Sequence, residues 1–147
     1  MKNYCEGVNS MKIAVAIDGS ENAMRAAKHA IMLAEYLPKV TLEVIYVQDY
    51  NKAKDERLLS QSPESLSLKR EQKLHPILAM AKEAAVDAKV IMLKGNPSQE
   101  IIQYVNEKKI DKLVIGSRGL NTIQEMVLGS VSHKVMKHVE CPVTVVK

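Results

Sequence analysis

The sequence predicts a single-domain α/β protein with an open parallel sheet and helices on both faces. Five short apolar, β-branched segments alternate with four segments of helical periodicity, and short connections join most of them. The chain has 147 residues, 46% of them hydrophobic and 26% charged. This length and composition suit one ordinary globular domain and favour neither a disordered nor a membrane protein.

The first strand and the first helix follow each other directly. Residues 12–18, "KIAVAID", form a β-branched apolar run that ends in a carboxylate, which is typical of a buried parallel strand. Over residues 23–37, apolar side chains recur at the i, i+3, i+4, i+7 spacing of one buried helical face. Ser20 or Asn22 is available as the N-cap, and Pro38 cannot continue the helix.

The rest of the chain continues this alternation. From residue 48 up to Leu74 the chain is polar, which predicts a mobile loop that enters a helix near residues 69–85. Asn96 followed by Pro97 predicts the start of the next helix. The remaining expected elements are strands over 40–47, 88–95, 111–116 and 141–147, and a helix over about 130–139. Four methionines at helix positions are expected to fill the core: Met24, Met32, Met80 and Met136.

The chain ends and the charges bear on location and partners. Residues 1–10 hold no apolar stretch of the signal-peptide kind, so we expect a flexible extension there, the domain over 11–147, and a cytoplasmic protein without a membrane anchor. Cys5 and Cys141 lack the spacing of metal ligands, which fits a reducing compartment. The net charge of +4 is mixed along the chain, so no nucleic-acid partner is expected.

Three of the six glycines lie in one segment, "GSRGLNTIQEMVLGSVS", with the spacing G-x2-G-x9-G-S. Gly116 and Gly119 follow a predicted strand, where a missing Cβ lets phosphates approach backbone N–H groups. Gly129 and Ser130 precede a predicted helix, whose first N–H groups bind anions. Arg118, between the first two glycines, adds a fork of donors for the same phosphates.

Asp18, at the end of the first strand, is the second candidate feature. If the first and fourth strands are neighbours, Asp18 and the glycines open into one crevice, where the carboxylate can bind a ribose, a base edge or a divalent cation. Structural alternatives stay open for each residue. Asp18 can form an Asx-turn or a helix cap, the glycines can serve as turns, and Ser130 can cap its helix.

Six stretches together carry a resemblance to a known family: "IAVAIDGS", "IYVQD", "GNPSQEII", "LVIGSRG", the complete G-x2-G-x9-G-S pattern and "CPVTVV". From about Met11 to Lys147 the chain resembles the ATP-binding branch of the universal stress protein family. The resemblance implies a Rossmann-like fold of the adenine nucleotide alpha hydrolase type, with a five-stranded sheet in the order 3-2-1-4-5. It also implies a homodimer through residues 141–147 and bound ATP, usually with Mg²⁺ or Mn²⁺.

The same resemblance implies roles for individual residues. Ala16, Asp18 and Val47 line the adenosine side, and Ile115 and Gly116 lie along the ribose. The phosphates are received by the remaining group: Gly119, Gly129, Ser130 and Val131. Some ATP-binding members have proline where Ala16 stands and histidine where Tyr46 stands, so the fit around adenine differs here.

Three functions stay open. The first is a nucleotide-dependent stress-response or signalling switch with an unidentified protein partner and at most slow ATP hydrolysis, because no general base accompanies the glycines. The second is a dimeric scaffold of the same fold that binds no nucleotide. The third is an RNA-binding protein, since "VIGSRGLNTI" also resembles the core of a K-homology domain, but that GxxG loop joins two helices, whereas Gly116 follows a predicted strand.

Overall fold

The computed structural model describes residues 10–51, 62–118 and 128–147, and in this part of the chain five strands alternate with four helices. The elements are β1 (Met11–Ile17), α1 (Glu21–Tyr36), β2 (Val40–Asp49), α3 (Pro63–Glu83), β3 (Asp87–Gly95), α4 (Pro97–Glu107), β4 (Lys112–Gly116), α5 (Ser130–His138) and β5 (Val143–Val146). The strands are parallel, in the order β3-β2-β1-β4-β5. The predicted fold class and strand order are confirmed.

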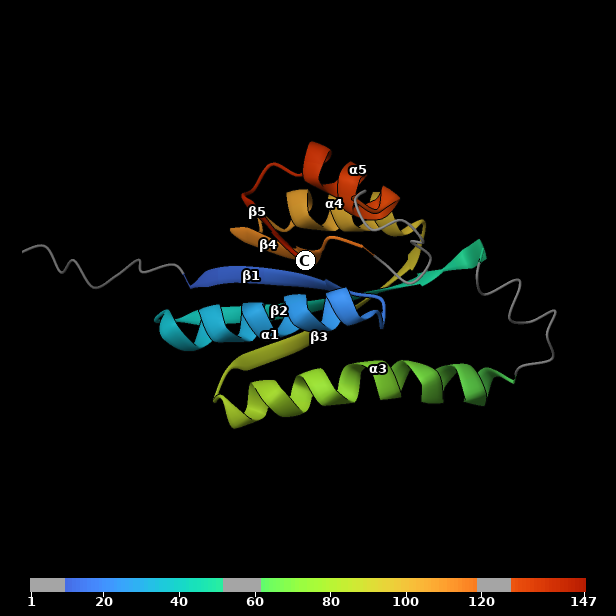
Figure 1. Cartoon of the computed structure of the whole chain (residues 1–147), viewed down its shortest axis with the longest axis horizontal. Coiled ribbons are helices and arrows are strands. Elements are labelled where there is room, and N and C mark those ends of the chain that lie inside the picture. The colour runs from blue at the N-terminus through green and yellow to red at the C-terminus, as the bar shows by residue number, and fades with distance from the viewer. Residues whose placement is uncertain (1–9, 52–61, 119–127) are drawn as a thin grey trace, which may run out of the picture.

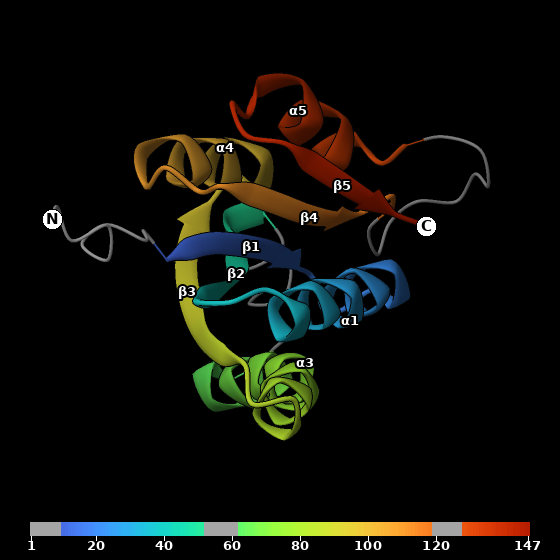
Figure 2. The same ribbon diagram turned by 90° about the vertical axis from the view of Figure 1, so that its left-hand side faces the viewer.

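Helices cover both faces of the sheet (Figure 1). α1 and α3 pack on one face and α4 and α5 on the other, as the turned view in Figure 2 also shows. The chain runs outward from β1 to β2 and β3, then returns to place β4 on the other side of β1. Because the strands are parallel, their carboxyl ends meet at one edge of the sheet, and the strand order reverses there between β1 and β4.

Strand β1 is buried on both faces. Ile13, Ala14 and Val15 are each 0% exposed. Ile13 and Val15 belong to the core beneath α1 and α3, and Ala14 belongs to the core beneath α4 and α5. Successive side chains of a strand point to opposite faces, so a central strand covered on both sides needs an unbroken apolar run.

The predicted starts of two helices are confirmed. Ser20 is the N-cap of α1, and its hydroxyl accepts a hydrogen bond from the N–H of Ala23 at 3.1 Å. Asn96 is the N-cap of α4, with its side chain accepting from the N–H of Gln99 at 3.2 Å and Pro97 as the first helical residue. Each bond satisfies an N–H group that has no partner within the helix.

The predicted loop before the helix near residues 69–85 is wrong in its last part, because α3 begins at Pro63. The Ser62 hydroxyl accepts from the N–H of Ser65 at 3.3 Å, and proline suits the first helical position. The first turns of α3 have no apolar periodicity, because the buried residues of this helix begin only at Leu74. Residues 52–61 of the predicted loop lie outside the described residues.

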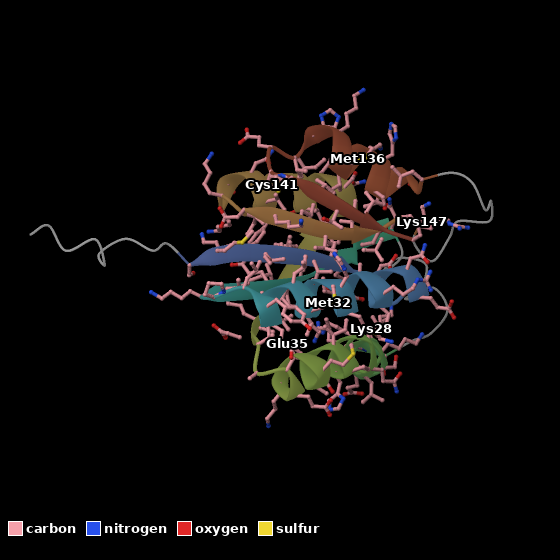
Figure 3. All side chains as sticks on the ribbon, turned by 60° about the vertical axis from the view of Figure 1, so that its left-hand side comes forward. Lys28, Met32, Glu35, Met136, Cys141 and Lys147 are labelled. Atoms are coloured by element: carbon pink, nitrogen blue, oxygen red, sulfur yellow. The ribbon has the colours of Figure 1, made fainter. Side chains whose placement is uncertain are left out.

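Two of the four methionines expected in the core are exposed. Met32 and Met136 each keep 44% of their surface in solvent, on the outer sides of α1 and α5 (Figure 3). Met24 and Met80 do pack against the core beneath α1 and α3. The inner face of α1 is instead formed mainly by alanines, which bring the helix close to the sheet.

The prediction about the N-terminal segment and the prediction about membranes have different outcomes. No helix in the described ranges is long and apolar enough to cross a membrane. Residues 1–9 lie outside the described part, so the flexible extension over 1–10 and the domain start at residue 11 stay predictions.

A buried carboxylate lies in the middle of the sheet. Glu43 on β2 is 5% exposed and accepts a hydrogen bond from the Tyr104 hydroxyl of α4 at 2.7 Å. Its second partner is the ammonium of Lys89 on β3, at 3.9 Å. Burial, and then the hydrogen bond to Glu43, raise the pKa of the Tyr104 phenol far above its usual value.

Replacing Tyr104 by phenylalanine is expected to lower the free energy of unfolding by about 1–3 kcal/mol, because Glu43 loses a donor while it stays buried. Since the folded state keeps the phenol proton that the unfolded chain releases near pH 10, the difference between wild type and variant should shrink as pH rises above about 10. Urea unfolding between pH 7 and 11 measures both effects. Tyr36, 81% exposed, gives the matched control Tyr36→Phe, and equal stabilities of all three proteins at pH 7 would contradict the prediction.

Candidate functional site

A cleft of about 840 Å³ opens at the carboxyl edge of the sheet, where the strand order reverses. The ends of β1, β2 and β4 form its floor. The first turns of α3, α4 and α5 form its walls. Ligands of open α/β sheets bind at this position, since the two loops at the reversal point diverge and leave a crevice between them.

Nine of the ten residues singled out from the sequence line this cleft. They are Ala16, Asp18, Val47, Ile115, Gly116, Arg118, Gly129, Ser130 and Val131. The tenth, Gly119, lies outside the described residues. The fold therefore brings together residues that are more than a hundred positions apart in the chain.

Two hydrogen bonds join the glycine turn after β4 to the start of α5. The N–H of Gly129 donates to the carbonyl oxygen of Ser117 at 2.8 Å. The Ser132 hydroxyl, which is buried, donates to the carbonyl oxygen of Gly116 at 2.7 Å. Because both bonds use main-chain atoms of the turn, they fix the first turn of α5 against the end of β4.

Gly116 is required by packing. A Cβ built at this position would lie 2.8 Å from the carbonyl carbon of Asn22 and 3.0 Å from the N atom of Ala23, both in the backbone of α1. The Asn22 amide also donates to the Ser117 hydroxyl at 3.1 Å, which holds this contact together. The structural reason for Gly116 is thus the close approach of α1 to β4.

The backbone of Gly129 does not by itself require glycine. Its backbone angles, φ −57° and ψ 153°, are open to any residue, and it is the N-cap of α5 without a side-chain cap bond. Ser130 is the first helical residue, so the alternative that Ser130 caps this helix is wrong. The N–H groups of Ser130, Val131 and Ser132 donate to no described residue.

The other described helices differ from α5 in this respect. Side chains cap α1, α3 and α4, and these side chains belong to Ser20, Ser62 and Asn96. Each accepts a hydrogen bond from its own helix start and so occupies the place of an outside acceptor. Among the described helices, α5 alone presents a start without such a side chain, and it does so at the wall of the cleft.

Asp18 forms the predicted Asx-turn and also lines the cleft. Its carboxylate accepts a hydrogen bond from the N–H of Ser20 at 2.8 Å, which is the predicted Asx-turn, and the same residue lines the cleft. Asp49, at the end of β2, is the second carboxylate of the described lining, and it accepts from the N–H of Asn51 at 3.0 Å. The described residues contain no cluster of three or more His, Cys, Asp or Glu side chains that could hold a metal ion by themselves.

Sequence reasoning missed a group of basic residues at the cleft. Lys69, Arg70 and Lys73 reach it from α3, and Lys134 reaches it from α5. The available signal was helical spacing: Arg70 stands four and seven residues before the apolar Leu74 and Ile77, and so on the same helix face.

Comparison with known proteins decides the family. The model of the universal stress protein family matches residues 9–147. The chain belongs to the universal stress protein family. Universal stress protein YxiE of Bacillus subtilis is 36% identical over 146 residues, an alignment that covers 92% of this chain and 98% of YxiE.

Solved structures of universal stress proteins share the fold. The structure of MJ0577, a universal stress protein of Methanocaldococcus jannaschii, superposes with a TM-score of 0.80 at 28% identity and covers 94% of this chain and 96% of its own. A family protein of Arabidopsis thaliana, solved with AMP bound, superposes with a TM-score of 0.66 at 25% identity, covering 93% and 91%. The K-homology alternative is wrong, because Gly116 ends a strand of a parallel sheet.

Proposed function

We propose that this universal stress protein binds ATP in the cleft and acts as a cytoplasmic, nucleotide-dependent switch in a stress response or in signalling. The observation that carries the proposal is the start of α5, where three N–H groups donate to no described residue and no side chain caps the helix. Unsatisfied N–H groups and the helix dipole favour an anion there. The cationic side chains of Arg118 and Lys134 line the same cleft.

The magnitudes are sufficient for a nucleotide. A charge-assisted hydrogen bond contributes about 1.5–3 kcal/mol, and micromolar affinity requires about 8 kcal/mol. Three amides, the nearby cations and an apolar wall for the base can together reach this value. Ala16, Val47 and Ile115 form the apolar wall. The AMP-bound family structure is a precedent for an adenine nucleotide in this fold.

Mg²⁺ or Mn²⁺ would be held mainly by the phosphates. Mg²⁺ commonly takes one or two carboxylates and completes its shell with phosphate oxygens and water. Asp18 and Asp49 are the carboxylates of the described lining, so the donor set fits a metal that arrives with ATP. The metal would neutralise part of the negative charge of the phosphates.

The cleft supports binding more than hydrolysis. Its described lining contains no histidine, glutamate or cysteine, so it offers few groups that could position and deprotonate an attacking water. This supports the proposal of at most slow ATP hydrolysis, with the bound nucleotide acting as a signal for a protein partner.

We also propose a homodimer through residues 141–147. β5 is an edge strand whose only strand partner among the described residues is β4, and its four residues are half-buried and uncharged. The open edge is thus able to pair with the same strand of a second copy.

The decisive experiment is direct. The purified protein is denatured, the released small molecules are identified by mass spectrometry, and ATP with Mg²⁺ is then titrated into stripped protein by calorimetry. We expect released adenine nucleotide or micromolar ATP binding, and a dimer mass by light scattering. A protein that releases no nucleotide and binds no ATP would instead be the dimeric scaffold, and a single-chain mass would remove the dimer from the proposal.

A further inference from the structure

Helix α3 changes character along one face. Leu74, Ile77 and Ala81 are 7%, 0% and 1% exposed where the helix packs on the sheet and α1. One turn earlier, the same face continues with Arg70, flanked by Lys69 and Lys73, and all three line the cleft. The face of α3 is therefore apolar over the core and basic over the cleft.

Lys73 is held in place by its surroundings. Its methylene stem lies against Gly19, where a Cβ would come within 2.8 Å of its Cδ and Cε atoms. Its ammonium lies 5.8 Å from the centre of the Tyr46 ring, a cation–π contact. Tyr46 pairs with Ile17 across β2 and β1, so the charge of Lys73 stands over the tips of these two strands.

Arg70 and Lys73 have no acidic partner among the described residues. Arg70 donates to the Ser67 hydroxyl at 3.3 Å, and neither Arg70 nor Lys73 contacts a carboxylate in the described part of the chain. The described lining of the cleft holds five lysine or arginine side chains against two carboxylates. Such an excess in a walled cleft repels itself and concentrates anions.

Lys73 stands apart from the phosphate site proposed above. The start of α5 is hydrogen-bonded to the end of β4, whereas Lys73 lies over β1 and β2. β1 separates β4 from β2, and two strand spacings amount to about 10 Å. A nucleotide whose phosphates are all at α5 would leave the basic face of α3 facing the nucleoside.

We propose that Arg70 and Lys73 form a second anion subsite, which takes a phosphoryl group on a ribose hydroxyl. This rests on the proposed function, because the first phosphate group is placed at α5. The favoured ligand class is then an adenosine bisphosphate with phosphoryl groups on both the 5′ and the 2′ or 3′ oxygen, held at two ends of the cleft. Guanidinium and ammonium groups are the usual partners of such phosphoryl oxygens.

Two isomeric probes test this. ADP and adenosine 3′,5′-bisphosphate carry the same nucleoside and two phosphoryl groups each, and differ only in where the second group is attached. Calorimetry is done with wild type, with the double variant Arg70→Gln/Lys73→Gln, and with Lys82→Gln, an exposed position on the same helix away from the cleft. Thermal unfolding confirms that each variant is folded.

We expect wild type to bind the bisphosphate about tenfold more tightly than ADP, and the double variant to lose about tenfold for the bisphosphate only. Lys82→Gln should change neither affinity. Tight ADP binding without a bisphosphate preference would overturn the second subsite and leave the proposed function standing, as would equal losses for both probes. Wild type that binds neither probe nor ATP would overturn both proposals.

Discussion

Gly129→Val is expected to weaken ATP binding about a hundredfold, equivalent to about 2.7 kcal/mol, without unfolding the protein. The valine side chain would stand at the start of α5, where Ser130 and Val131 line the cleft and their N–H groups donate to no described residue. The φ angle of −57° at this position suits valine, so the substitution adds no backbone strain. Calorimetric titration with ATP and Mg²⁺ measures the loss.

Ser130→Ala is the matched control for this variant. It removes a hydroxyl at the same helix start but keeps every N–H group, so ATP affinity should fall by less than about threefold if the main-chain amides hold the phosphates. Thermal melts in the absence of nucleotide should coincide for wild type and both variants. A folded Gly129→Val protein with wild-type affinity for ATP would show that the phosphates are held elsewhere.

Gly116→Val is expected to destabilise the fold by about 3 kcal/mol, which for a domain of this size lowers the melting temperature by about 10 °C. The new Cβ would meet the backbone of α1 at Asn22 and Ala23, at 2.8 and 3.0 Å. Backbone atoms cannot turn away as a flexible side chain can, so either α1 must move from β4 or the strand end must shift. Urea and thermal unfolding without nucleotide measure the effect.

Gly129→Ala is the control variant for the close contact between Gly116 and α1. It adds a Cβ to the other described glycine of the cleft, where the backbone angles suit alanine, and its loss of stability should be smaller than that of Gly116→Val. If Gly116→Val is as stable as Gly129→Ala, the close contact between β4 and α1 does not constrain this position.

Local signals made some elements predictable. The start of α4 at Asn96 and Pro97 was predictable from the sequence. The cap bond joins residues only three positions apart, so its signal is local. Strand β1 was predictable for a similar reason, since burial on both faces demands a continuous apolar run. The glycine pattern together with Asp18 was enough to indicate the region of the cleft, and the resemblance to the universal stress proteins supplied the strand order.

Other features depend on residues far apart in the chain. Glu43 accepts a hydrogen bond from Tyr104, 61 positions later, and no local pattern in β2 predicts this contact. The first turns of α3 lack apolar periodicity because they line the cleft, so the polar stretch read as a loop. The role of Gly116 was also hidden, since the backbone that excludes a side chain there belongs to α1.

The sequence by itself determined the alternation of strands and helices, the starts of α1 and α4, and the candidate residues of the cleft. Periodicity and capping act over a few residues, and that is why they can be recognised in the chain alone. The tertiary structure decided that α5 is the described helix whose start has no side-chain cap, and that Lys73 of α3 lies over β1 and β2. Both depend on how elements distant in sequence pack across the sheet, and no local pattern encodes such contacts.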